Sequence, residues 1–124
     1  MNNVNEPKID FQLHEALSDS RVTGRNCGVD VPVGTVFTAL CRRDFPITAP
    51  GDTVISPEAA FVSGISLRLD SVEWYRHSIN HITAGHTAML TLSGTGFDTV
   101  TEALSTAPER TYYSLCTSAK AVAK

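Results

Sequence analysis

Residues 65–74 read Ile-Ser-Leu-Arg-Leu-Asp-Ser-Val-Glu-Trp, and this stretch decides the fold. Its first five residues place an apolar side chain at every second position, which indicates a β-strand with one buried and one wet face. The apolar positions then shift by one residue, to Val72 and Trp74. Such a change of phase predicts a β-bulge inside a continuing strand.

Further short strands are expected on both sides of this stretch, because β-branched, aromatic and alternating apolar runs are separated by turn residues. We expect strands at residues 10–14, 34–41, 53–55, 60–62, 88–92 and 112–116, turns at 49–52 and 84–86, a loop over 18–31 and a charged break at 42–44. At most one short helix is expected, near residues 99–106, where Thr99 and Glu102 fit a capping box. This pattern predicts an all-β domain, folded as either a small antiparallel β-barrel or a β-sandwich.

The bulk composition is that of one globular domain, which we place over residues 1–124. Hydrophobic residues make up 42% and charged residues 19%, and the formal net charge is −3, which gives little general attraction to nucleic acid. Three widely spaced cysteines, Cys27, Cys41 and Cys116, favour free thiols in a reducing compartment. We find no secretory signal and no apolar run that would cross a membrane, so we expect a cytoplasmic protein.

Four motifs occur in a recognisable order along the chain. They are Gly-Thr-Val-Phe-Thr at 34–38, Gly-Asp-Thr-Val at 51–54, Val-Glu-Trp-Tyr-Arg-His-Ser-Ile-Asn-His-Ile-Thr-Ala-Gly at 72–85 and Leu-Thr-Leu-Ser-Gly at 90–94. Together they resemble domain II, the β-barrel of elongation factor Tu and related translational GTPases, over roughly residues 9–104. The resemblance implies a barrel over residues 9–94, and 95–124 would then be a C-terminal extension with the short helix and a last strand.

The chain also departs from that family in ways that bear on function. It has no Gly-x-x-x-x-Gly-Lys-Ser/Thr loop, so we expect it neither to bind nor to hydrolyse GTP. Ala39 stands where the family has glycine, and residues 21–30 look like an insertion. In the family the barrel works beside a nucleotide-binding domain, and these residues encode no such domain.

The resemblance implies a contact surface in the segment Val72–Gly85. Glu73 and Arg76 match family positions at the pocket for the aminoacyl end of tRNA, where the carboxylate lies by the terminal ribose. Taken without the family, they would be an exposed ion pair at a bulge, worth less than about 1 kcal/mol. Trp74 and Tyr75 point to opposite faces if the chain is extended, so either both are core or one is an exposed contact.

Histidines and arginines near this segment offer two further hypotheses. His77, His81 and His86 are included in the candidate surface as solvated side chains, because their spacing fits no known metal-ligand pattern and we expect no metal. Four arginines form either a basic strip for RNA or a face balanced by neighbouring aspartates; they are Arg42, Arg43, Arg68 and Arg76.

No residue pattern indicates catalysis. The sequence has no nucleophile elbow and no carboxylate pair that stands out, so we expect no enzyme, no catalytic residue and no cofactor. We expect a binding or adaptor module that recognises a protein, or RNA, partner of the translation apparatus. The alternative is an immunity-type or regulatory protein that binds and blocks a toxin or another protein. The contact surface is either the segment Val72–Gly85 or the expected loop Arg21–Asp30.

Overall fold

The computed structural model describes residues 9–45, 51 and 59–117. In chain order its elements are β1 (Asp10–Leu17), β2 (Arg21–Asn26), β3 (Val31–Pro32), β4 (Val36–Asp44), β5 (Ala60–Trp74), β6 (His77–Ile79), β7 (His81–Ile82), β8 (Thr87–Thr95), α1 (Phe97–Ser105) and β9 (Thr111–Cys116). The described part of the chain is therefore all-β with one short helix, as predicted. In this part of the chain, no helix is long and apolar enough to cross a bilayer.

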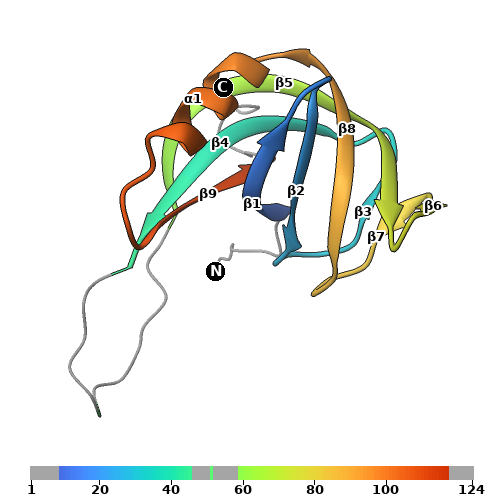
Figure 1. Cartoon of the computed structure of the whole chain (residues 1–124), viewed down its shortest axis with the longest axis horizontal. Coiled ribbons are helices and arrows are strands. Elements are labelled where there is room, and N and C mark those ends of the chain that lie inside the picture. Colours follow the sequence, from blue (N-terminus) through green and yellow to red (C-terminus); the bar gives the residue numbers. More distant parts are fainter. Residues whose placement is uncertain (1–8, 46–50, 52–58, 118–124) are drawn as a thin grey trace, which may run out of the picture.

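The main sheet closes on itself. Its seven strands follow the order β4-β9-β1-β2-β8-β5-β6, and β4 also pairs with β5. Six strands thus form a ring, to which β6 is added as the second strand of a hairpin with β5 (Figure 1). α1 lies across one end of the ring, where its Val100 is fully buried with the core. β3 and β7 form a separate pair beside the ring.

The core is built by the alternation seen in the sequence. Ile65, Leu67 and Leu69 of β5 are buried, as are the apolar residues at positions 88, 90 and 92 of β8. The register between these two strands shifts between Leu69 and Ser71, and Val72 is then buried in turn. The predicted bulge is thereby confirmed, and it keeps a long strand facing one core while the chain bends around the ring.

The prediction of a loop over residues 18–31 was wrong, because β2 occupies residues 21–26. This strand lies between β1 and β8, so the supposed insertion is part of the ring. Its inward positions include Gly24, where a Cβ atom would overlap the carbonyl oxygen of Gln12 and the ring of Phe11. In the sequence this glycine indicates a loop, but in the structure a glycine is required because the backbone of β1 approaches so closely.

Asn26 is a second inward-facing residue of β2 that is not typical of a strand, so it also favoured the prediction of a loop. Its amide nitrogen donates hydrogen bonds to the carbonyl oxygens of Val29 and Ile82, both at 2.9 Å. Its side-chain oxygen accepts a hydrogen bond from the backbone of Gly28 at 3.0 Å. The side chain is fully buried, and these bonds satisfy it while they fix the chain that leads to β3.

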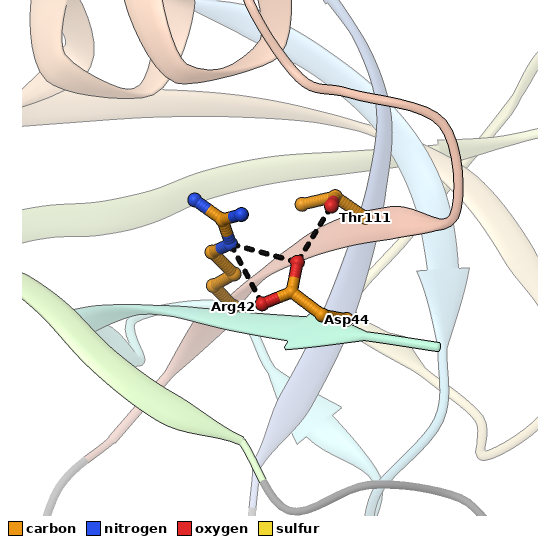
Figure 2. A network of polar contacts seen from close by, with 3 residues as sticks. All are labelled: Arg42, Asp44 and Thr111. Atoms are coloured by element: carbon orange, nitrogen blue, oxygen red, sulfur yellow. Dashed lines mark hydrogen bonds and ion pairs between the residues drawn. The ribbon is translucent and has the colours of Figure 1, made fainter. Parts of the chain in front are cut away.

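The charged residues 42–44 do not break β4, contrary to prediction. Arg42 donates from Nε to both carboxylate oxygens of Asp44, at 2.9 and 3.0 Å, and Thr111 of β9 donates its hydroxyl to the same carboxylate at 2.6 Å (Figure 2). Asp44 and Thr111 are also directly opposite in the register of the two strands. The polar side chains therefore pair across the end of the sheet and let the strand continue.

The helix and the last strand also differ in detail from expectation. α1 follows Gly96, which has a φ of 107°, and no side chain caps its first turn, so the predicted capping box of Thr99 and Glu102 is wrong. β9 lies between β1 and β4. Residues 111–116 thus belong to the ring, which therefore continues beyond residue 94, where the expected barrel ended. The expected strand at 53–55 and most of the turn at 49–52 lie outside the described residues.

Candidate functional site

The hairpin between β5 and β6 has a two-residue turn of unusual composition. Trp74 pairs with His77, and between them Tyr75 and Arg76 have φ values of 51° and 67°. Positive φ at both central residues suits the twist of a hairpin, but it normally selects Asn-Gly. A residue with a Cβ atom in this conformation costs about 1–2 kcal/mol. A bulky aromatic residue and an arginine are therefore held at the tip under strain.

Three rings are gathered at this tip. The indole of Trp74 stacks on His86 with a centroid distance of 5.3 Å and an interplanar angle of 12°. The ring of Tyr75 lies 4.8 Å from that of Trp74, and Tyr75 is 78% exposed. The turn brings the two adjacent aromatic side chains together, so the expectation of opposite faces was wrong. Trp74 is half-buried at the surface and Tyr75 is exposed, so neither belongs to the core.

A hollow of about 340 Å³ opens beside the hairpin. Glu73, Trp74, Tyr75 and Arg76 line one side of it, so the structure brings together four of the residues chosen from the sequence. The hollow extends over β8 and β2, where Glu73 pairs with Met89 and Met89 pairs with Thr23. The three side chains form a row across three neighbouring strands.

His14, Thr23 and Met89 line the hollow and were missed from the sequence. In β1, Leu13 pairs with Gly24 and Glu15 with Thr23, so His14 is the extra residue of a bulge. The bulge turns this side chain toward the hollow. The pattern of one strand could not predict that these three residues line a hollow, because this depends on how β1, β2 and β8 pair with one another.

The remaining histidines of the predicted surface lie apart from the hollow. His77 is exposed on β6, and His81 lies on β7, where its ring contacts Asn80 Oδ1 at 2.9 Å and Thr83 Oγ1 at 3.5 Å. His86 joins the site through its stack on Trp74. Over residues 9–45 and 59–117, no group of three His, Cys, Asp or Glu side chains is arranged to hold a metal ion.

Three of the four arginines are paired with aspartates and do not form a basic strip. Arg43 binds Asp10 at 2.7 Å and Arg68 binds Asp70 at 3.2 Å, in addition to the pair at the end of β4. Among the described residues, neither Arg76 nor Glu73 has an ion-pair partner. The expected Glu73–Arg76 pair is therefore absent there, and both charged groups face the hollow unpaired.

No model of a protein family, no curated protein and no solved structure matches this chain. The resemblance to domain II of elongation factor Tu therefore remains a prediction from the four sequence motifs.

Proposed function

We propose that this chain is a non-catalytic binding module that docks a protein partner on the β5–β6 hairpin and in the adjoining hollow. The observation that carries the proposal is the strained turn at Tyr75 and Arg76. Strain of this kind persists where the exposed side chains have a use, because a turn of Asn and Gly would fold more easily. Tyrosine and arginine are also among the side chains that are enriched at interface hot spots.

The chemistry of the hollow suits a segment of polypeptide. Trp74, Tyr75 and Met89 offer apolar surface to an aromatic or aliphatic side chain. Glu73 accepts hydrogen bonds from backbone amides or basic groups, and Arg76 offers a planar set of donors to carbonyl or carboxylate oxygens. An amphipathic hollow with a few unpaired polar groups is typical of a specific contact site.

A protein partner is favoured over RNA by the distribution of charge. Arg42, Arg43 and Arg68 are paired with aspartates, so they do not form a strip for a phosphate backbone. The carboxylate of Glu73 in the hollow would repel phosphate. The sequence resemblance makes components of the translation apparatus the first partners to assay.

Site-specific crosslinking tests the proposal. A photoreactive phenylalanine analogue replaces Tyr75 in one variant and Tyr112, a tyrosine on β9 that is 43% exposed, in a matched control. Light-induced adducts in native lysate are compared with and without an excess of unlabelled protein, and with and without ribonuclease. We expect a discrete protein adduct from position 75 that the excess removes and that ribonuclease leaves intact. Equal adducts from both positions, or adducts to RNA alone, would contradict the proposal.

A further inference from the structure

Two cysteines that are far apart in the sequence lie side by side on β4 and β9. The register places Cys41 opposite Ser114 and Cys116 opposite Ala39, so the two cysteines are diagonal neighbours. The alternate residues Leu40 and Leu115 are fully buried in the core. The cysteines therefore share the face of the sheet that is turned away from the core, and both are half-buried free thiols.

Charged groups of β1 and β4 border this pair. Asp10 lies opposite Cys116 on β1, and its Oδ2 binds the guanidinium of Arg43 at 2.7 Å. The other carboxylate oxygen, Oδ1, is buried without a hydrogen-bond partner. Arg43 thus extends from β4 across β9 to β1 and brings a positive charge close to the thiols.

The two thiols have different acidities. A hydrogen bond from Cys116 lowers the pKa of Cys41 to about 7, and burial and Asp10 oppose this shift while Arg43 adds to it. The same hydrogen bond raises the pKa of Cys116, as burial also does. Cys27, the third cysteine, has its pKa raised, mainly by burial and then by Asp10. Cys41 is therefore the more acidic of the two thiols and is ionised to a substantial degree near neutral pH, and the thiolate is the reactive form.

We propose that Cys41 and Cys116 form an oxidation site for hydroperoxides, in which Cys41 is the attacking thiolate and Cys116 resolves the product as a disulfide. The sulfur of Cys41 attacks the terminal oxygen of the hydroperoxide, the O–O bond breaks, and an alcohol or water leaves with a proton. The sulfenic acid formed on Cys41 carries the two-electron oxidation. Cys116 then attacks this sulfur, the S–O bond breaks, and hydroxide leaves as water with the proton of Cys116.

The diagonal placement indicates a reversible bond rather than a structural one. Diagonal neighbours on antiparallel strands have Cα atoms about 7–8 Å apart. A relaxed disulfide spans roughly 4.4–6.8 Å, so closure must shift the two paired strands slightly along each other or bend them, which leaves the bond strained and easily reduced. This site lies on β4 and β9, away from the β5–β6 hairpin, and does not depend on the proposed binding function.

The test treats the full chain with equimolar hydrogen peroxide, followed by peptide mapping without reduction. We expect a monomer that has lost two hydrogen atoms, a Cys41–Cys116 linked peptide, and its reversal by glutathione. In Cys116→Ser the sulfenic acid on Cys41 should persist and be trapped by dimedone. Cys41→Ser should form neither product, and Cys27→Ser should behave like the unaltered chain. Circular dichroism and melting curves establish that each variant is folded.

A second measurement does not depend on the disulfide. Alkylation of Cys41 by iodoacetamide should follow a titration centred near pH 7 and be about fivefold or more faster than that of Cys27 at neutral pH. Cys116→Ser should shift that titration to higher pH only in part, because the serine hydroxyl can still donate a hydrogen bond to the Cys41 thiolate. Cys116→Ala removes the hydrogen bond and should give the larger shift to higher pH. Equal alkylation rates of the three thiols, or peroxide oxidation that stops at Cys41 in the unaltered chain, would overturn the proposal.

Discussion

Tyr75 and Arg76 stand side by side in the left-handed conformation, with φ values of 51° and 67°, at a turn that Asn-Gly would form without strain. The pair presents an aromatic ring and a guanidinium at the tip of a hairpin whose base is held by Trp74 and His77. The left-handed conformation lowers the stability of this turn, and the turn exposes the side chains of Tyr75 and Arg76 to solvent.

Relief of this strain should be measurable. Arg76→Gly removes the Cβ atom that makes a left-handed residue costly, and we expect the free energy of unfolding to rise by about 1 kcal/mol. Urea denaturation checks this. Arg68→Gly is the matched control, because Arg68 is an exposed arginine of β5 outside the left-handed region, and it should lower stability. A loss of stability in Arg76→Gly would show that the turn is not strained.

The stack of Trp74 on His86 can be followed by fluorescence, since the chain has one tryptophan. His86→Ala uncovers one face of the indole, so the emission should move to longer wavelength and acrylamide should quench it more strongly. The expected loss of stability is about 0.5–1.5 kcal/mol. His81→Ala is the control, because His81 contacts Asn80 and Thr83 instead. Identical spectra for both variants would contradict the stacked geometry.

Gly24 is expected to tolerate no side chain. In Gly24→Ala the new methyl group would overlap the backbone of Gln12 and the ring of Phe11, and neither can move without shifting β1. We expect a loss of about 3 kcal/mol or more, at the upper end of what overpacking costs. Gly64 is the matched control in β5, where a Cβ atom would meet nothing within 4 Å. The two alanine variants should melt at clearly different temperatures.

The hydrogen bonds of Asp44 with Arg42 and Thr111, at the ends of β4 and β9, predict that stability depends on pH. Hydrogen bonds from Thr111 and from Arg42 lower the pKa of Asp44 below its ordinary value of 3.8. Because the folded pKa lies below the unfolded one, the charged carboxylate stabilises the fold above the unfolded pKa, and this contribution is lost as the pH falls through the folded pKa. Thr111→Val should therefore be less stable than the unaltered chain at neutral pH. The difference should shrink below about pH 4, and urea unfolding at both pH values measures it.

The parts of the fold that sequence reasoning found are those with a local signature. The alternation from Ile65 to Leu69 and the change of phase at Val72 follow from the pleat of one strand, so both could be predicted. β2 could not, because Gly24 and Asn26 occupy inward positions for reasons that lie in β1 and in the chain near β7. A glycine that admits a neighbouring backbone looks the same in sequence as a glycine in a loop.

The candidate site divides in the same way. Glu73, Trp74, Tyr75 and Arg76 are contiguous, and a motif was enough to find them. His14 and Met89 reach the hollow through a bulge in β1 and through the pairing of three strands, so only the register reveals them. The turn at residues 75–76 was also invisible, because it contains neither glycine nor asparagine.

The most direct test of the binding account combines Tyr75→Asn and Arg76→Gly in one variant and measures its melting temperature and its affinity for the partner crosslinked at position 75. The substituted turn is better suited to the hairpin, so the melting temperature should stay level or rise. The affinity should fall by at least about tenfold, or 1.4 kcal/mol, while Tyr112→Asn binds normally. Unchanged affinity in the double variant would contradict the claim that the β5–β6 hairpin is the docking surface.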